Sequence, residues 1–379
     1  MADASIDYGD AIRQIECRRK FGKKFGSTLK AFPQFIFPSL LSGEQATSDL
    51  LASYHATLIG SGVDMVDLTA GLGIDAMHFA AEAKSIIAVE LDSEKVEALR
   101  YNALGLGINN LSAVNGDCND FIEDSIDAGK RYEVAFIDPA RRDDNGGRVF
   151  ALTDCAPDVV NLLPKLREIC DVLIIKASPM LDISHTVAAL APWVRDLIVL
   201  GTPSECKELI AMLDFRAECE EPVIKAVTLH TDGSATEVFT FTASDERACE
   251  QAKVKTTLSE GDYIYEMSPT MMKSGVFRLV AKQYSLSIFH PNTRLFASAD
   301  AVEQFPGCRY KVLRALPFAS RVIKSFAKEY RQVNVAVRNF GMTADALRKK
   351  LGVSDGGELR LYGFTDSRGE RVLALVEKG

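Results

Sequence analysis

Short apolar runs alternate with helical stretches through the middle of the chain. The runs that read as strands are residues 63–68, 85–90, 111–114, 132–137, 171–176 and 195–200. Amphipathic segments fit between most of them, and this alternation is typical of a doubly wound parallel sheet. Two further runs, 223–230 and 236–242, flank Thr231-Asp232-Gly233-Ser234. That turn signal predicts an antiparallel hairpin at the end of the sheet.

The residues on either side of this region follow other patterns. Residues 11–25 predict a basic helix, and Pro33 and Pro38 break the pattern that follows it. A capping box at Ser42-Gly43-Glu44-Gln45 then predicts a helix start, and Gly60-Ser61-Gly62 its end. After a polar stretch at 243–260, about 120 residues mix helical and strand patterns. We therefore expect an N-terminal helical extension (1–60), an α/β domain (61–245) and a smaller α+β domain (246–379).

Composition narrows the class of protein. Hydrophobic residues make up 47% of the 379 residues and charged residues 25%, the balance of a soluble globular protein. We expect no membrane span and no signal peptide, and so a cytoplasmic protein. The eight cysteines form no CxxC pair and the five histidines no HxxxH spacing. A metal site is therefore not expected.

The net charge of −8 conceals an asymmetry. Residues 60–249 carry a net −17 and residues 250–379 a net +8, while all seven basic residues of the first 59 lie within 13–30. Basic flanks around an acidic middle suggest that the flanks meet an anion. Ordinary solubility charge explains the same numbers equally well.

Acidic residues end four successive predicted strands. The first strand runs into Asp67-Leu68-Thr69-Ala70-Gly71-Leu72-Gly73-Ile74-Asp75, and the next ends at Glu90, 19 residues after Gly71. A glycine turn lets a ligand approach bare backbone, and an acid at this distance can reach ribose hydroxyls. Because Gly71-x-Gly73-x-x-Ala76 also fits a dinucleotide fingerprint, an NAD enzyme stays open at this point. The third strand ends at Asp117 and the fourth at Asp138-Pro139-Ala140-Arg141, a series that is unusual for a dehydrogenase.

These four segments resemble motifs I to IV of class I S-adenosylmethionine-dependent methyltransferases. The stretch from Val66 to Asp117, preceded by a helix that contains Thr47, is similar to RNA-cap trimethylguanosine synthases. The whole chain resembles bacterial methyltransferases with a THUMP-like C-terminal domain, through Tyr263-Ile264-Tyr265-Glu266-x-x-Pro269, Lys273-x-Gly275, Phe305-Pro306-Gly307 and Asn339-Phe340. The resemblance implies a Rossmann-like, doubly wound, seven-stranded sheet with an antiparallel terminal hairpin.

The resemblance also implies a role for each matching residue, with S-adenosyl-L-methionine as the cofactor. Asp67, Gly71, Gly73 and Asp75 would line its methionine and ribose side, Glu90 would hold the ribose and Asp117 the adenine. Asp138, Pro139 and Arg141 would face the acceptor base as the catalytic group, and Thr47 would complete the cofactor site.

The fourth motif departs from the family pattern. Enzymes that methylate exocyclic amines usually have Asp/Asn-Pro-Pro and an aromatic residue, where this chain has Ala140 and Arg141. Methylation of a base carbon would need a nucleophilic cysteine, and Cys118 and Cys155 read as packed thiols. Lys176-Ala177-Ser178-Pro179 reads as a plain strand exit, and Ser204 to Glu208 as a helix cap.

The predicted C-terminal domain contains a basic run from Lys311 to Arg338, with seven basic residues, one acid and three interleaved aromatic residues. This pattern suits a nucleic-acid surface, for which Arg321, Lys324 and Lys328 are the candidates. An amphipathic helix with its aromatic residues in the core is the alternative. We expect an S-adenosylmethionine-dependent methyltransferase that methylates a base in structured RNA, either tRNA or rRNA. A small-molecule or protein methyltransferase, or a catalytically degenerate RNA-binding protein, stays open.

Overall fold

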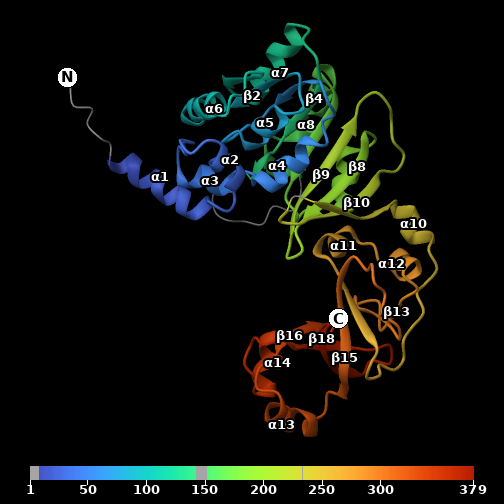
Figure 1. Ribbon diagram of the computed structural model, residues 1–379. Coiled ribbons are helices and arrows are strands. Elements are labelled where there is room, and N and C mark those ends of the chain that lie inside the picture. Colours follow the sequence, from blue (N-terminus) through green and yellow to red (C-terminus); the bar gives the residue numbers. More distant parts are fainter. Residues whose placement is uncertain (1–7, 142–151, 233) are drawn as a thin grey trace. The chain divides into compact units, whose positions relative to one another are not determined.

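The structure is a computed structural model that describes residues 8–141, 152–232 and 234–379. The chain forms two compact units, Met1–Thr202 with Cys206–Thr240 and Pro203–Glu205 with Phe241–Gly379 (Figure 1). The site described below lies in the first unit.

A nine-stranded sheet among the described residues forms the centre of the first unit, in the order β11-β10-β8-β9-β7-β4-β1-β2-β3. Its strands are β1 (Asp64–Asp67), β2 (Ser85–Glu90), β3 (Leu111–Asn115), β4 (Tyr132–Ile137), β7 (Cys170–Ala177), β8 (Val194–Gly201), β9 (Cys206–Asp214), β10 (Val223–Leu229) and β11 (Ala235–Phe241). Strands β1, β2, β3, β4 and β7 run parallel, as do β8 and β10. The predicted α/β fold is confirmed.

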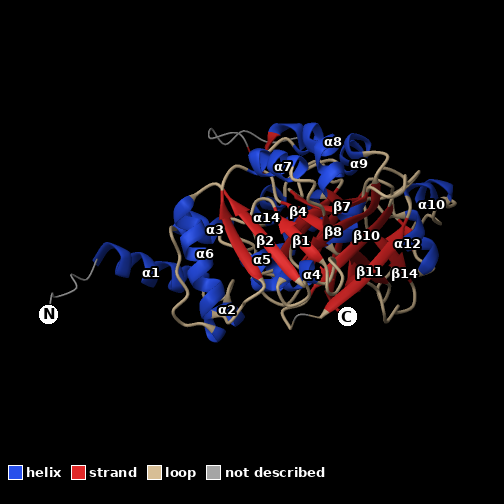
Figure 2. Cartoon of the chain, turned by 90° about the horizontal axis from the view of Figure 1, so that it is seen from above, coloured by secondary structure: helices blue, strands red, loops and turns tan. Residues whose placement is uncertain are grey.

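Both faces of this sheet are buried, which explains the continuous apolar runs. In β7, Leu173 and Ile175 pack on one face and Ile174 on the other. The first face carries α7 (Cys118–Asp127), α8 (Val159–Ile169) and α9 (Ile183–Leu190), and the opposite face α4 (Asp49–Ala56), α5 (Ile74–Phe79) and α6 (Ser93–Gly105) (Figure 2). A small ribbon of β5 (Ala140–Arg141) and β6 (Cys155–Ala156), with the 3₁₀ helix Leu152–Asp154, follows β4.

Strand β9 shows that two predictions were wrong: the helix cap at residues 204–208 and the place where the sheet becomes antiparallel. Residues 204–208 were expected to cap a helix, but Cys206 to Glu208 begin β9, which lies antiparallel between β7 and β8. The sheet therefore reverses direction at the β8–β9 connection, before the hairpin expected at 223–242. Strands β10 and β11 are neighbours joined by a short turn, in which the His230 N–H donates to the Ser234 carbonyl at 2.9 Å. Both strands coincide with predicted runs, whereas β9 was not predicted, and the sheet has nine strands where the resemblance implied seven.

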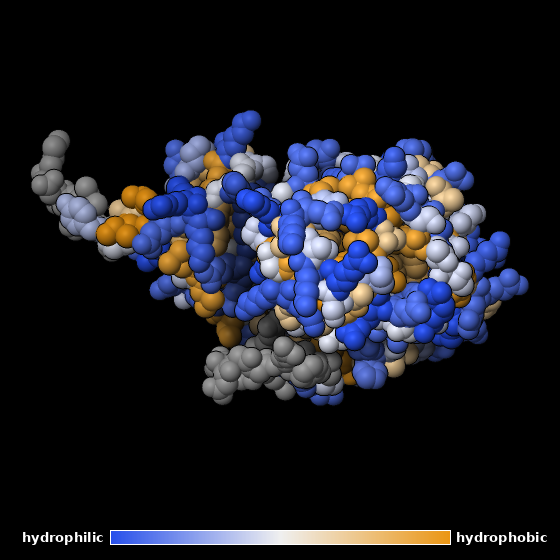
Figure 3. All heavy atoms as spheres, turned by 90° about the horizontal axis from the view of Figure 1, so that it is seen from below, coloured by the Kyte–Doolittle hydropathy of each residue, from blue (hydrophilic) through white to orange (hydrophobic). Residues whose placement is uncertain are grey.

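From Tyr8 onward, four helices precede the sheet: α1 (Tyr8–Phe21), α2 (Gly26–Ala31), α3 (Leu40–Gln45) and α4. The capping box predicted at Ser42 is wrong, because Ser39 is the N-cap and Ser42 is its partner. The chain leaves the helix at Ala46, and Ser48 caps α4. Phe21, Phe25 and Phe37 pack together and attach this extension to the first unit. Exposed apolar side chains gather on α1, beside the grey N-terminal residues in Figure 3.

The second unit is built on a separate seven-stranded sheet, counted within the described residues, in the order β13-β14-β12-β15-β18-β17-β16. Its elements are α10 (Ala243–Ala248), β12 (Tyr263–Met267), α11 (Pro269–Ser274), α12 (Arg278–Gln283), β13 (Ser287–Ile288), β14 (Phe296–Ser298), β15 (Gly307–Pro317), α13 (Ser320–Glu329), β16 (Asn334–Arg338), α14 (Ala344–Leu351), β17 (Arg360–Thr365) and β18 (Arg371–Lys378). Helices α13 and α14 pack on one face of this sheet. Among the described helices of both units, none is long and apolar enough to cross a bilayer.

Candidate active site

The turn after β1 exposes backbone at the carboxyl edge of the sheet. The Thr69 N–H donates to the buried Asp67 carboxylate at 3.1 Å, so this side chain braces the turn. Gly73 has a φ of +82°, and a Cβ there would lie 2.1 Å from Leu99 Cδ1. At Gly71, with φ +57°, a Cβ would meet nothing within 4 Å. Gly73 is thus required for packing, and Gly71 leaves open space where a ligand can approach.

Glu90 lies beside this open position. Its Oε2 accepts from the Gly71 N–H at 2.7 Å and its Oε1 from the Asp92 N–H at 2.9 Å. The Lys95 ammonium lies 3.7 Å from Oε1. Because a carboxylate offers about four lone-pair sites, Glu90 retains acceptor capacity for a ligand. The structure therefore places the Glu90 carboxylate beside the open position at Gly71.

Asp117 stands at the end of the adjacent strand, β3. It is the N-cap of α7, where it accepts from the Asn119 backbone N–H at 2.7 Å and from the Asn119 side chain at 2.6 Å. Asp117 is thus held in one orientation at the same edge of the sheet as Glu90.

A second group of predicted residues meets at the end of β4. The Asp138 N–H donates to Thr69 Oγ1 at 2.7 Å, which ties this residue to the glycine turn. Its carboxylate Oδ2 lies 2.5 Å from the Lys176 ammonium at the end of β7, and 35% of the Asp138 side chain is exposed. Pro139 is buried behind it, and Arg141 lies in β5 opposite Cys155. The side chain of Arg141 lies outside the described residues.

Lys176 links Asp138 to a buried network. Its ammonium donates to Thr47 Oγ1 at 2.9 Å and lies 3.9 Å from Asp75 Oδ2. Thr47 in turn donates to Asp75. His55 of α4 lies between two carboxylates, with Nδ1 2.8 Å from Asp75 Oδ1 and Nε2 hydrogen-bonded to Glu208 of β9. Thr47 and Asp75 therefore belong to this network beside Asp138.

Opposite charges set the protonation of this network. Burial alone would lower the pKa of His55, but Glu208 and Asp75 raise it to about 9. Burial would also lower the pKa of the Lys176 ammonium, but Asp138 and Asp75 raise it. At Asp75 burial would raise the pKa of the carboxyl, but His55 and Lys176 lower it. Burial raises the pKa of Asp138 against the opposing effect of Lys176. It raises the pKa of Asp67 well above its ordinary value. Near neutral pH, His55 and Lys176 are cations.

Three functional candidates escaped the sequence reasoning: Lys176, His55 and Glu208. The sequence pattern predicts a strand exit at Lys176 and a helix cap that includes Glu208. It predicts no role for His55. One signal was available for Lys176, since it ends a buried strand next to β4, whose own end carries Asp138. His55 and Glu208 are 153 residues apart, and only the position of β9 brings them together.

The predicted RNA-binding residues lie in the second unit, whereas this site lies in the first. Helix α13 buries Phe326 and packs Val322 and Ile323 into its core, while Arg321, Lys324 and Lys328 are exposed. These three residues are called the α13 basic face below. The aromatic residues of the run, Phe318, Phe326 and Tyr330, contribute to the core, as the alternative interpretation expected.

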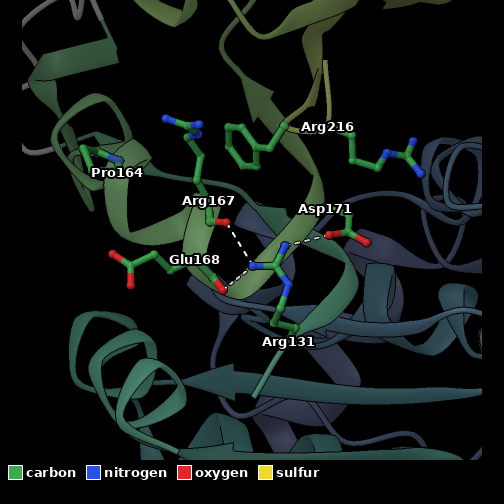
Figure 4. Close-up of a pocket in the computed structure, with 7 residues that line it drawn as sticks. Arg131, Pro164, Arg167, Glu168, Asp171 and Arg216 are labelled. Atoms are coloured by element: carbon green, nitrogen blue, oxygen red, sulfur yellow. Dashed lines mark hydrogen bonds and ion pairs between the residues drawn. The ribbon is translucent and has the colours of Figure 1, made fainter. Parts of the chain in front are cut away.

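A separate pocket of about 380 Å³ in the first unit is lined by Arg131, Pro164, Arg167, Glu168, Asp171, Phe215 and Arg216 (Figure 4). It lies where β4 and β7 begin, the edge opposite to the carboxyl ends. Arg131 donates to the backbone of Glu168 at 2.5 Å and to Asp171 at 2.7 Å, and Arg216 is paired with Asp214. Arg131 and Arg216 thus pair with groups of the fold itself. None of the predicted site residues is among those that line this pocket.

The α/β sheet with helices on both faces is a methyltransferase fold, and a THUMP-like domain follows it in the chain. Residues 307–378 match the THUMP domain-like family, and residues 263–306 match a ferredoxin-like domain family. The THUMP-like resemblance is confirmed for residues 307–378, a shorter part of the chain than the predicted 246–379.

The chain is similar along its whole length to a protein of solved structure from Porphyromonas gingivalis W83, described as a "putative methyltransferase". The two share 29% identity and a TM-score of 0.89, over 100% of this chain and 93% of that one. Two curated relatives are named 23S rRNA (uracil(1939)-C(5))-methyltransferase RlmD. The protein from Vesicomyosocius okutanii subsp. Calyptogena okutanii is 31% identical over 41% of this chain and 31% of its own length. The protein from Idiomarina loihiensis is 34% identical over 27% and 19%. This chain thus spans less than a third of either curated relative.

Proposed function

We propose that the protein is an S-adenosylmethionine-dependent methyltransferase that methylates structured RNA, either tRNA or rRNA. The observation that carries the proposal is the arrangement at the carboxyl edge of the sheet. There the Asp138–Lys176 pair is tied through Thr69 to the glycine turn. Open sheets of this kind bind ligands at that edge. The similarity to the Porphyromonas gingivalis protein along both chains supports the same conclusion.

The residues at this edge suit S-adenosylmethionine better than NAD. S-Adenosylmethionine carries an ammonium, a sulfonium, a ribose diol and an adenine amine, all of which favour acceptors or negative charge. Glu90 and Asp117 are fixed carboxylates on neighbouring strands. The pyrophosphate of NAD would instead bring negative charge close to these acids. The N-terminus of α5, a helix of six residues, would be the feature of the glycine turn that favours it. When bound, the cofactor would supply an electrophilic methyl group.

The residues of the chain then divide into three roles. Gly71 opens the turn, while Glu90 and Asp117 would accept hydrogen bonds from the ribose and adenine. Asp138 and Pro139 would face the nucleotide, and Lys176 orients Asp138. Thr47 and Asp75 contact the Lys176 ammonium and fix its position, and His55 in turn pairs with Asp75.

An RNA substrate is supported by the second unit. It combines the THUMP-like match with the α13 basic face and a net charge of +8 over residues 250–379. The curated relatives are named as rRNA methyltransferases. We assign cofactor binding to residues 61–245 and RNA binding to 246–379, with residues 1–60 as a supporting extension. Since tRNA and rRNA are its substrates, we place the reaction in the cytoplasm.

Calorimetry with S-adenosylmethionine and with NAD tests the cofactor. We expect binding of the first alone, and Glu90→Ala should weaken it by about 1–3 kcal/mol, the scale of hydrogen bonds to a charged group. Asp138→Ala should abolish methyl transfer and leave cofactor affinity nearly unchanged. Micromolar binding of NAD without S-adenosylmethionine would show that the assignment is wrong.

A further inference from the structure

The Lys176 ammonium is a permanent positive charge beside the acceptor position. It lies 2.5 Å from Asp138, and only 12% of its side chain is exposed. Two neighbouring carboxylates, Asp138 and Asp75, keep it protonated by raising its pKa. A lysine held in this way cannot serve as a base, but it can donate hydrogen bonds and stabilise negative charge.

The charge that develops on the attacking atom separates three classes of acceptor. An exocyclic amine that attacks a methyl group becomes positive, and an ammonium beside it opposes that change. A base carbon needs activation by a cysteine thiolate. Burial raises the pKa of Cys118 to about 11, and Cys155 is 6% exposed in the core. A hydroxyl group that loses its proton becomes negative, which is the charge that Lys176 favours.

A second lysine adds to the positive charge near Lys176. Lys24, between α1 and α2, donates to the carbonyls of Gly43 and Glu44 at 2.9 and 2.7 Å. Burial and the proximity of Lys176 and Lys207 lower its pKa to about 8.

We propose that the acceptor atom is a hydroxyl oxygen, the ribose 2′-hydroxyl of an RNA nucleotide, with Lys176 stabilising its developing negative charge and Asp138 taking its proton. The inference rests on the proposed function, because it assumes RNA as substrate and a sulfonium methyl donor. It departs from the base-carbon chemistry named for the two curated relatives.

The step balances in atoms and charge. The O–H bond breaks and its proton moves to the Asp138 carboxylate, which becomes a neutral carboxylic acid. The ribose oxygen forms a bond to the methyl carbon as the carbon–sulfur bond of the donor breaks, and that electron pair stays on sulfur. The sulfonium charge is thus replaced by the proton on Asp138, and Lys176 keeps its charge throughout. Burial of Asp138, which raises its pKa, makes it a better proton acceptor.

The test uses the full-length protein, S-adenosylmethionine with a radioactive methyl group, and total RNA from a strain that lacks the protein. Alkali cleaves RNA through attack by the 2′-hydroxyl, so a 2′-O-methyl group blocks cleavage at that nucleotide. We expect the label in alkali-resistant dinucleotides. Label in mononucleotides would overturn the hydroxyl assignment while leaving RNA methylation intact. Absence of any labelled RNA would instead remove the proposed function, and this inference with it.

Variants assign the roles. Asp138→Asn should lower kcat by about 10²–10⁴-fold, the scale of a lost general base. Lys176→Met should lower kcat by a similar factor, and Lys176→Arg should recover part of it because the charge returns. All three should bind S-adenosylhomocysteine within about threefold of the wild-type Kd by calorimetry, which also reports correct folding of the first unit. Lys165→Met is the matched control, since its ammonium pairs with Glu123 on the surface. A Lys176→Met variant that binds S-adenosylhomocysteine and retains wild-type kcat would overturn the role of Lys176.

Discussion

The histidine bridge between Asp75 and Glu208 makes the stability of the first unit depend on pH in a definite direction. His55 is 1% exposed, and its two carboxylate partners raise its pKa from 6.5 to about 9. Since the folded pKa lies above the unfolded one, the native state favours the protonated ring. The stabilisation is complete below pH 6.5 and is lost as the pH rises through about 9. The difference between the folded and unfolded pKa of His55 corresponds to about 3 kcal/mol in the free energy of unfolding.

The perturbation that isolates this effect is His55→Gln, which removes the cation between Glu208 and Asp75 and leaves Asp75 with Lys176 alone. At pH 6 we expect a loss of about 3–5 kcal/mol, as for removal of one member of a buried pair. At pH 9.5 and above, the difference between wild type and variant should shrink by about 3 kcal/mol, because the wild-type ring is then neutral as well. Asp75 does not contribute over this range, since His55 and Lys176 hold the pKa of its carboxyl below its ordinary value.

Urea denaturation measures this difference, with fluorescence of Trp193 as the signal. Trp193 is the only tryptophan and belongs to the first unit, where it packs against Arg167 and Phe215. The control is His78→Gln. His78 Nε2 lies 3.5 Å from Asp49 Oδ1, and the His78 side chain is 22% exposed. The His78→Gln substitution should therefore lower the free energy of unfolding by less than about 1 kcal/mol at each pH. A His55→Gln effect that stays constant between pH 6 and 9.5 would refute the charged bridge.

Two further predictions concern packing and RNA. Gly73→Ala should destabilise the first unit by about 1–3 kcal/mol in urea, since its Cβ would clash with Leu99 at a φ of +82°. Gly71→Ala, which meets open space, should cost less, and equal costs would contradict the packing role. Replacing the α13 basic face with Ala should weaken RNA binding across unrelated sequences in filter assays. The salt slope should become shallower by about one unit per lost contact at most. Cofactor affinity should not change, and a triple Ala variant at Lys84, Lys130 and Lys165 provides the control. Wild-type RNA affinity in the folded α13 variant would favour a merely solvated helix.

The sequence predicts the parallel part of the sheet closely because those strands are buried on both faces. Residues 85–90 and 132–137 coincide with β2 and β4. Burial on both faces requires an unbroken apolar run, and such a run can be read without knowing its neighbours. The helix start at Ser42 was misplaced because Ser39, Ser42 and Ser48 all have capping side chains, and local sequence does not rank them.

Strand β9 was missed for a different reason. It begins with Cys206-Lys207-Glu208, whose charges resemble a helix terminus, and becomes apolar only from Leu209. Glu208 is tolerated in a buried strand because His55 compensates its charge from a helix far away in sequence. A local pattern cannot contain that compensation. The acids at the ends of β1 to β4, by contrast, could be predicted to share one edge, because parallel strands align their carboxyl ends.

The residues that the sequence reasoning passed over share a feature that distinguishes them from ordinary surface charges. Lys176 and Glu208 both adjoin the buried apolar run of a strand that is central in the sheet. A charge in such a position is costly unless an opposite charge reaches it, so its presence implies a partner on a neighbouring element. For Lys176 the neighbour is β4, and the acid at the end of β4 is Asp138. For Glu208, Lys176 of the neighbouring β7 acts through its charge, and the hydrogen-bonded partner His55 comes from α4 on the face of the sheet. The first pairing follows from strand order alone, whereas the second requires the packing of a helix. This difference explains why a sequence can indicate which edge of such a sheet carries the candidate site and still leave out the network behind it.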